Sequence, residues 1–338
     1  MQSYPLRNYV VDITPINQRL FGWIRFEDNR NWIRLDEKPL SFLFSITKRD
    51  DSLHSWKIHF RDQLNNDIQC DIHDLEAAPT NVTDFPNLDE KHKRFFKVSI
   101  STNNKQQIFT CSVDNGDTRE DVFCFSPNLS YPAFLFSACQ QYLPLITHKD
   151  FPNFVETGSL FGHTSIHAGN WFDTVHSIEL STELYNELPV QWAKQRGIHF
   201  HHGSSAAKLP DIINSLCGPT VFFLDSHWSG DNTVDWNNSS FVGYPIDTAH
   251  LGGDGSPSPE QQKPIIEELE LIMATFPDEA LIIIDDWKLF GVKDTAFDGM
   301  DWTHISQRAV IELLDNNSRV IVHNVLDGHR YAIGLRAT

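Results

Sequence analysis

Two glutamates and the glycine-spaced turn between them are the residues whose types and spacing favour ligand chemistry. Glu156 ends a short apolar run that begins at Phe154, and Gly158 and Gly162 follow it. Glycine lets a ligand approach the backbone closely, and a helix that begins after the turn offers unpaired N–H groups. Glu179 ends a second apolar run about 20 residues later, where an acid can bind the two hydroxyls of a ribose. This pattern predicts a strand, turn, helix and strand with an acid at the tip of each strand.

The form of the turn separates two kinds of cofactor site. It reads E-x-G-x-x-x-G, not the G-x-G-x-x-G that is typical of a dinucleotide pyrophosphate site. The turn and its acids resemble motif I of the class I S-adenosylmethionine-dependent methyltransferases, although many members have glycine where this chain has Leu160. The resemblance implies that Glu156 lies near the methionine amino group and that Glu179 binds the ribose. It implies further cofactor contacts from Thr157, Gly158, Gly162, Thr164, Leu180, Ser204, Ser205 and Asp225.

Further acidic residues follow two more apolar runs that predict parallel strands. One run ends in Asp225, and the other ends in the pair Asp285-Asp286. Ligands of open α/β sheets lie outside the carboxyl ends of the strands. Carboxylates that converge on one edge repel each other unless a cation lies among them, and a hard divalent ion prefers oxygen ligands. The sequence therefore favours a cationic ligand, a metal ion or both at this edge.

The segments LDSH (224–227) and IIIDD (282–286) resemble the metal-dependent sugar O-methyltransferases of the macrocin type. This resemblance, which covers about residues 151–335, implies that Asp225, Asp285 and Asp286 hold magnesium or manganese. It also implies that His227 is the general base. Such an ion lowers the pKa of a bound hydroxyl, and an imidazole can accept the proton. The implied activity is O-methylation of a sugar, glycan or other small hydroxylated acceptor with S-adenosylmethionine.

Two other functions stay open at this point. The first is a metal-independent methyltransferase that acts on a small hydroxylated metabolite. The second is a non-catalytic glycan-binding protein with a Rossmann-like domain. For His227 the alternative is a structural hydrogen bond, and for Asp285-Asp286 it is a helix cap plus a surface acid. A nicotinamide-dependent dehydrogenase is disfavoured because the turn lacks the required glycine pattern.

The elements that position these residues predict an α/β fold. From residue 131 to 338 the pattern indicates a Rossmann-like, doubly wound, mostly parallel sheet, which ends in an antiparallel hairpin around Asp327-Gly328. Residues 1–130 alternate with period two and predict a smaller antiparallel β-rich domain. That domain is interpreted as structural or as a binder of substrate or glycan. Three tryptophans are expected to fill its core: Trp23, Trp32 and Trp56.

Three more segments carry expectations. Residues 262–276 predict an amphipathic helix whose glutamates, Glu267, Glu268 and Glu270, form a solvated face. Residues 229–259 are rich in Gly, Ser, Asn, Asp and Pro and predict a lid beside the chemistry. Histidines 199, 201 and 202 lie on or beside a predicted strand, where a structural or cofactor-wall role is favoured over a metal site.

Composition limits the classes of binding partner and the cellular compartment that the sequence favours. A formal net charge of −18 disfavours nucleic acid and anionic membranes as partners. The five cysteines are scattered without C-x-x-C spacing, which favours a reducing cytoplasm. No apolar run approaches the length of a membrane span, and the first residues lack the apolar core of a signal peptide. A homo-oligomer stays open.

Overall fold

The computed structural model describes residues 151–226 continuously and the rest of the chain in shorter ranges. These ranges are 2–5, 9–15, 23–26, 29–32, 40–48, 57–75, 93–100, 108–114, 116, 118–125, 133–146, 234–235, 240–241, 264–292, 302–326 and 328–338. The chain divides into two compact units, Met1–Ala133 and Phe134–Thr338.

The first unit is built from antiparallel strands, as the period-two pattern predicts. One sheet has the order β1-β2-β5-β8-β7 and another the order β10-β9-β6, and a separate pair joins β3 to β4. The bounds are β1 (Gln2–Pro5), β2 (Tyr9–Pro15), β3 (Trp23–Phe26), β4 (Asn29–Trp32), β5 (Leu40–Lys48), β6 (Lys57–Arg61), β7 (Cys70–Leu75), β8 (Lys93–Ile100), β9 (Phe109–Asp114) and β10 (Arg119–Phe125). Trp23 and Trp32 are paired in register, whereas Trp56 lies outside the described residues.

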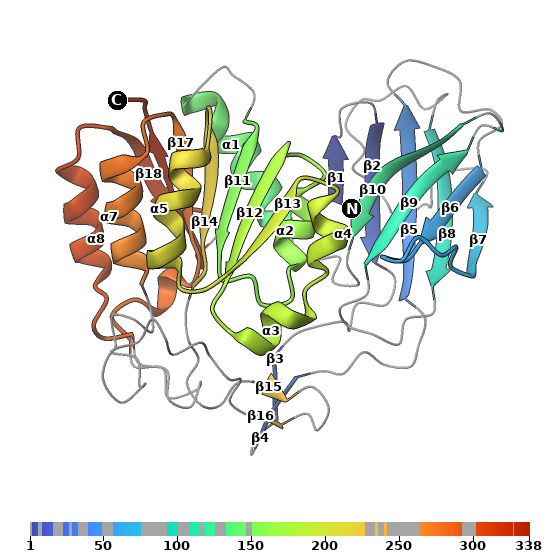
Figure 1. Ribbon diagram of the computed structural model, residues 1–338, viewed down its shortest axis with the longest axis horizontal. Helices are drawn as coiled ribbons and strands as arrows, with labels where there is room; N and C mark the ends of the chain where they lie inside the picture. Colours follow the sequence, from blue (N-terminus) through green and yellow to red (C-terminus); the bar gives the residue numbers. More distant parts are fainter. Residues whose placement is uncertain are drawn as a thin grey trace. The chain divides into compact units, whose positions relative to one another are not determined.

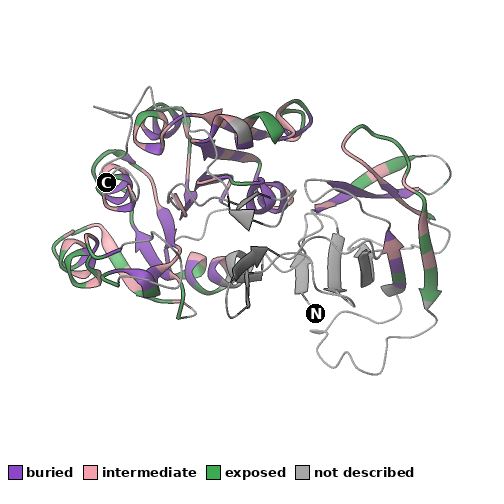
Figure 2. Ribbon diagram, turned by 90° about the horizontal axis from the view of Figure 1, so that it is seen from below, coloured by how far each residue is buried: buried purple, intermediate pink, exposed green. Residues whose placement is uncertain are grey.

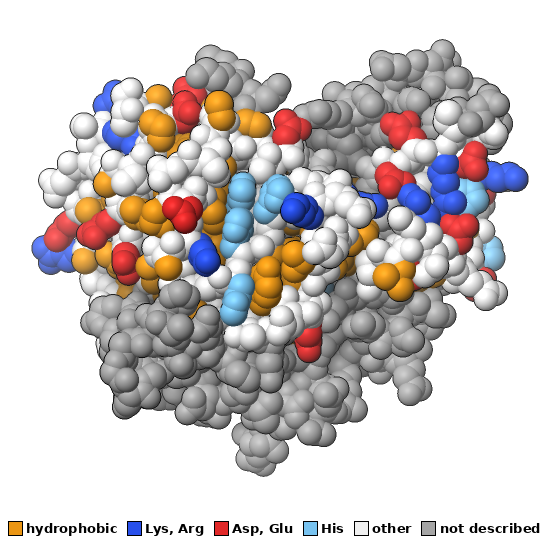
Figure 3. Space-filling model, viewed as in Figure 1, with side chains coloured by type: hydrophobic (Ala, Val, Ile, Leu, Met, Phe, Trp, Pro, Cys, Tyr) orange, Lys and Arg blue, Asp and Glu red, His pale blue; other side chains and the backbone are white. Residues whose placement is uncertain are grey.

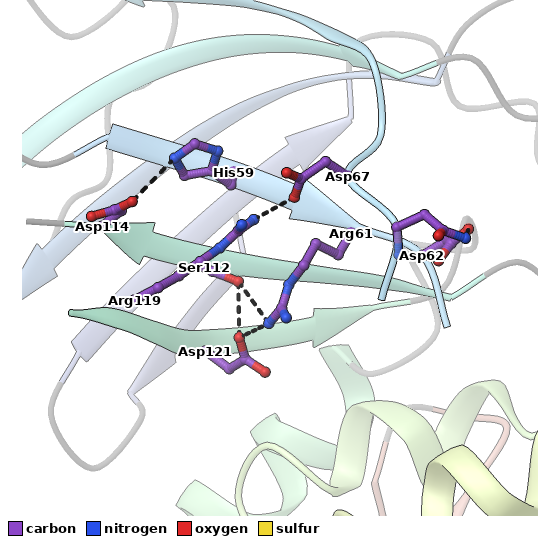
Figure 4. Close-up of polar contacts among 9 residues, drawn as sticks. His59, Arg61, Asp62, Asp67, Ser112, Asp114, Arg119 and Asp121 are labelled. Carbon is purple, nitrogen blue, oxygen red and sulfur yellow. Dashed lines mark hydrogen bonds and ion pairs between the residues drawn. The ribbon is translucent and has the colours of Figure 1, made fainter. Parts of the chain in front are cut away.

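The three-stranded sheet of this unit has an apolar and a polar face. Phe109 and Phe125 are buried, with ring centroids 5.3 Å apart. On the other face Arg61 pairs with Asp121, and Arg119 Nη2 lies 2.7 Å from Asp67 Oδ1 (Figure 4). A sheet that packs through one face and pairs charges on the other is typical of antiparallel β structure.

The second unit holds one seven-stranded sheet with the order β13-β12-β11-β14-β17-β19-β18 (Figure 1). The pairings from β13 to β17 are parallel, whereas β19 is antiparallel to both of its neighbours. The strands are β11 (Asn153–Thr157), β12 (Thr174–Glu179), β13 (Ile198–His202), β14 (Thr220–Leu224), β17 (Ala280–Ile284), β18 (Val320–Val325) and β19 (Tyr331–Leu335). The fold is therefore the predicted α/β class, with a mostly parallel sheet and a terminal antiparallel hairpin.

Helices cover both faces of this sheet. They are α1 (Ala133–Ile146), α2 (His163–Ala168), α3 (Thr182–Glu187), α4 (Val190–Lys194), α5 (Ser205–Ser215), α7 (Ile265–Thr275), the 3₁₀ helix η3 (Trp287–Leu289) and α8 (Gln307–Asp315). Helices α5, α7 and α8 share one apolar core with the sheet, and α1 packs on its other face at Gly334 (Figure 1). The apolar runs of β14 and β17 are buried along their whole length, as central strands require. Figure 2 shows buried residues along the strands and exposed residues on the outer sides of the helices.

The strand order reverses between β11 and β14. From β11 the chain builds outward through β12 and β13, and it then returns to the other side of β11 with β14 and β17. Open α/β sheets bind ligands in the crevice at such a switch point, outside the carboxyl ends of the strands. This topology places the loops after β11 and β14 beside each other.

The described residues contain little of the predicted lid. In this stretch the structure describes only the short pair β15 (Val234–Asp235) and β16 (Ser240–Phe241), and the lid stays a prediction. No helix within the described part of the chain combines the length and the apolar character that crossing a bilayer requires.

Candidate cofactor site

The turn after β11 has a left-handed backbone at three positions. The φ angles are +89° at Gly158, +49° at Leu160 and +72° at Gly162. The amides of Gly158 and Ser159 both donate to the carbonyl of Ile178 at 3.0 Å, which fixes the turn on β12. Because left-handed backbone costs a non-glycine residue about 1–2 kcal/mol, glycine is the natural residue at position 160. Leu160 therefore carries a backbone cost that a glycine at this position would avoid.

The two glycines of the turn are required by its own packing. A Cβ atom on Gly158 would lie 2.5 Å from the carbonyl oxygen of Asp225. A Cβ on Gly162 would lie 2.8 Å from the ring of Phe200. The sequence analysis explained these glycines by the approach of a ligand. In the structure, Asp225 and Phe200 occupy the space that a side chain at these positions would need. The loops after β11 and β14 therefore touch, and the amide of Asp225 donates to Thr157 at 3.1 Å.

Replacing Gly158 with alanine is expected to lower the free energy of unfolding by more than left-handed strain alone. Gly328→Ala is the matched control, since Gly328 has φ +80° with nothing within 4 Å of its Cβ position. We expect a loss of about 1 kcal/mol for the control and of at least about 2 kcal/mol for Gly158→Ala, measured by chemical denaturation. Equal losses in the two variants would show that the contact with Asp225 relaxes without cost.

Glu156 lies in the interior, where it ties three elements together. Only 2% of its surface is exposed. Its Oε2 accepts hydrogen bonds from Ser165 of α2 at 2.5 Å and from Ser177 of β12 at 2.7 Å, and the Thr164 side chain also bonds to this carboxyl group. Burial raises its pKa to about 8, against the lowering effect of these hydroxyls. Burial therefore favours the neutral form of this carboxyl group.

Glu179 has the geometry that the ribose interpretation needs. Its Oε2 accepts the amide of Leu160 and its Oε1 the amide of Ser181, both at 2.8 Å. The amide of Leu180 also bonds to this carboxyl group. A carboxylate has about four acceptor sites, so the group retains capacity for one ribose hydroxyl. Burial raises its pKa to about 7, and the backbone amides, including that of Leu180, oppose this shift. The backbone of the turn therefore fixes the orientation of the Glu179 carboxyl group.

The remaining predicted cofactor residues lie around the same edge. Ser204 accepts the amide of Ala207 at 3.3 Å and caps α5, and Ser205 is buried as the first residue of that helix. Thr157 is the buried last residue of β11, and Leu180 is half-buried after β12. The predicted residues thus lie on neighbouring loops. Ser204 also has a structural role, because its side chain caps α5.

Asp225 lies close enough to Asp285 to affect the ionisation of the Asp285 carboxyl group. Burial raises the pKa of Asp285 most, repulsion by Asp225 adds to the rise, and the Arg330 guanidinium opposes it. Arg330 Nε lies 3.1 Å from Asp285 Oδ1, and the amide of Asp286 donates to the same oxygen at 2.9 Å. Asp286 itself has a left-handed φ of +53°. The cation that accompanies Asp285 in the structure is therefore an arginine.

The metal interpretation gains no support from the described side chains. Within the described ranges, no group of three or more His, Cys, Asp or Glu residues is arranged to hold a metal ion. His227, the predicted base, lies outside the described residues. The described side chains therefore offer no ligand set for a divalent ion, and no chemical step is derived through one.

The expectation of a solvated acidic face was wrong at Glu268. Glu267 and Glu270 are exposed, but no part of Glu268 is. Its Oε2 accepts Thr157 Oγ1 at 3.0 Å and its Oε1 accepts Ser226 Oγ at 2.5 Å. Burial raises its pKa to about 7. The signal was present in the sequence, because position 268 falls on the apolar stripe of Ile265, Leu269 and Ile272.

Strand pairing brings a further histidine to those predicted on β13. His176 of β12 is paired in register with His199, and its Nδ1 lies 2.9 Å from His201 Nε2. Histidine side chains gather at the surface in the middle of Figure 3. His202 instead lies 3.2 Å from Thr182 Oγ1 and stacks on Tyr185. These contacts involve the edge strand β13 and its neighbour β12, and they are compatible with the structural role that the sequence favours.

The strand order and the acidic loops at the switch point define an open, Rossmann-like α/β protein. No family model and no curated protein matches the sequence. Solved structures with a similar chain path include an rRNA methylase from Streptococcus thermophilus, at 11% identity over 60% of this chain and 93% of that one, with a TM-score of 0.31. A second is a protein from Streptococcus mutans named as a methyltransferase, in complex with SAH, at 8% identity over 62% of this chain and 99% of that one, with a TM-score of 0.34. A third is the N-methyltransferase NodS from Bradyrhizobium japonicum, at 11% identity over 62% of this chain and 98% of that one, with a TM-score of 0.33. At these TM-scores the likeness says nothing about what this chain binds.

Proposed function

We propose that this chain is an S-adenosylmethionine-dependent methyltransferase whose cofactor binds at the loops after β11 and β12. The observation that carries the proposal is Glu179. Three backbone amides hold it at the carboxyl end of β12, and its oxygens retain capacity for a ribose hydroxyl. Its place beside the switch point of the sheet is where ligands of open α/β folds bind.

A cationic ligand would change the ionisation of the buried acids at this edge. Glu156 and Glu179 both have raised pKa values because burial disfavours their charged forms. A positive ligand at this edge would favour ionisation of the carboxyl groups and would be attracted by them in return. The cofactor supplies a methyl group on a positively charged sulfur. The protein's part is to bind the ribose at Glu179, to hold the turn through Glu156 and to position the acceptor.

For the acceptor we infer a hydroxyl of a sugar, glycan or other small molecule, with His227 as the base that removes its proton. Support comes from the sequence resemblance of LDSH alone. Three alternatives follow from the sequence: metal-assisted transfer to this acceptor, metal-independent transfer to a small metabolite, and non-catalytic glycan binding. Transfer from labelled cofactor to a hydroxylated acceptor, with and without a chelator, separates the three: transfer in excess chelator excludes the metal, and absence of transfer despite cofactor binding favours the non-catalytic protein.

Calorimetry with S-adenosylhomocysteine tests the placement of the cofactor. Glu179→Ala is expected to weaken binding by roughly 1.5–3 kcal/mol, the usual loss for hydrogen bonds to a charged group, which is about 10- to 150-fold in Kd. Glu187→Ala, an exposed glutamate at the end of α3, is the control and should bind as the wild type does. Unchanged affinity in a folded Glu179→Ala protein would exclude this ribose site.

A further inference from the structure

Glu268 is a fully buried carboxyl group with no role in the chemistry described above. It projects from α7 and has no exposed surface. A buried carboxyl group is unfavourable unless its hydrogen bonds are satisfied, and three hydroxyls satisfy this one. They belong to Thr157, Ser205 and Ser226.

The three hydroxyls come from three different loops at the same edge of the sheet. Thr157 ends β11 and leads into the turn at Gly158, Ser205 begins α5 after β13, and Ser226 follows β14 directly after Asp225. Each of these loops contains residues assigned above to the cofactor or the acceptor. Glu268 is therefore a single side chain that bonds to all three.

The loops have little freedom to adjust around this carboxyl group. Gly158 already touches the backbone of Asp225, and the amide of Asp225 donates to Thr157 at 3.1 Å. The hydrogen bonds from Thr157 at 3.0 Å and from Ser226 at 2.5 Å connect the same two segments to Glu268. A shift of either hydroxyl would change the distance between the turn and the loop after β14.

We propose that Glu268 is the positioning residue that sets the three loops of the cofactor edge against one another. This inference rests on the proposed function for its effect on binding, although not for its effect on the loops. An apolar residue at 268 leaves the hydroxyls of the buried residues Thr157 and Ser205 without this acceptor, which costs more than the loss of an exposed bond. Glutamine keeps an acceptor and adds a donor of similar shape, so it is expected to substitute for the acid.

The test compares Glu268→Leu, Glu268→Gln and the exposed control Glu270→Gln, together with Thr157→Val alone and combined with Glu268→Leu. Hydrogen exchange is measured on the ligand-free proteins, and affinity for S-adenosylhomocysteine by calorimetry. In Glu268→Leu we expect exchange at Gly158 and Asp225 to accelerate about fivefold or more and affinity to fall about tenfold. Exchange in β19 is expected to stay unchanged. Glu268→Gln should remain within about threefold of the wild type in both measurements.

Double substitution separates positioning from general packing. If Thr157 acts through Glu268, Thr157→Val adds little in the Glu268→Leu background, whereas independent effects add. The inference would be overturned if exchange rates in the loops and affinity in Glu268→Leu matched those in Glu270→Gln. It would also be overturned if the effects of Thr157→Val and Glu268→Leu were strictly additive. If Glu268→Leu does not fold, Thr157→Val and Ser226→Ala replace it in the test, because each removes one hydrogen bond to Glu268. Thr157→Val should accelerate exchange at Asp225, and Ser226→Ala should accelerate it at Gly158. The absence of any acceleration would overturn the inference.

The two proposals fail in different ways. A wild-type protein that binds no S-adenosylhomocysteine, with loops that loosen in Glu268→Leu, would refute the cofactor and leave the positioning role intact. Binding by the wild type with unaltered loops and affinity in Glu268→Leu would refute the positioning role alone.

Discussion

Replacing Glu156 with glutamine is expected to make the ligand-free protein more stable than the wild type in alkaline solution. The folded protein raises the pKa of Glu156 from 4.5 to about 8 through burial. An acid whose pKa is raised by folding contributes stability that is fully present below its unfolded pKa and is lost as the pH rises through its folded pKa. The wild type should therefore lose this contribution between about pH 4.5 and pH 8, whereas glutamine does not titrate.

The size of the effect follows from the shift in pKa. At about 1.4 kcal/mol per pH unit, the free energy of unfolding should differ between the two proteins by roughly 3–5 kcal/mol at pH 9 relative to pH 4.5. Chemical denaturation across this range measures it, and Glu187→Gln is the control for an exposed glutamate. Parallel pH profiles for the wild type and Glu156→Gln would mean that Glu156 is ionised in the folded protein.

Acid is expected to destabilise the protein through His163, with the opposite dependence on pH. This side chain, at the start of α2, is 7% exposed, and burial lowers its pKa from 6.5 to about 4. A depressed folded pKa gives stability that is present above the unfolded pKa and is lost as the pH falls through the folded pKa. The expected loss between pH 7 and pH 4 is roughly 3 kcal/mol.

His163→Phe removes this titration and should flatten the acid limb of the profile. Any constant change in packing shifts the whole curve and leaves its slope unaffected, so the slope is the quantity to compare. His329→Gln, at an exposed histidine whose backbone bond to Trp287 is kept, should retain the wild-type slope. An unchanged slope in His163→Phe would assign the acid sensitivity to other groups.

Local patterns were sufficient to predict the fold class. The apolar runs that became β14 and β17 are buried along their whole length, and their composition alone indicates central parallel strands. The hairpin from Val320 to Leu335 followed from its turn residues. The acids at the strand ends were found for the same reason, because the end of a strand is visible in sequence.

Contacts that depend on distant partners could not be predicted in this way. Thr157 and Glu268 are 111 residues apart, and nothing near either of them in sequence indicates the other. His176 meets His201 through the register of two strands, and Arg330 reaches Asp285 from beyond β18. The reason for Gly158 was also misjudged, since the clash with Asp225 becomes visible only once the loops are placed.

The order in which the sheet can assemble follows from the position of β19. This strand lies between β17 and β18, although both precede it in the chain. During synthesis, β18 therefore emerges before the strand that joins it to the sheet exists, and one edge of β17 stays open until Tyr331–Leu335 has been made. An open edge of an apolar strand such as β17 can pair with other chains. Nascent chains that stall shortly before Tyr331 should consequently be the species most exposed to aggregation and most dependent on chaperones.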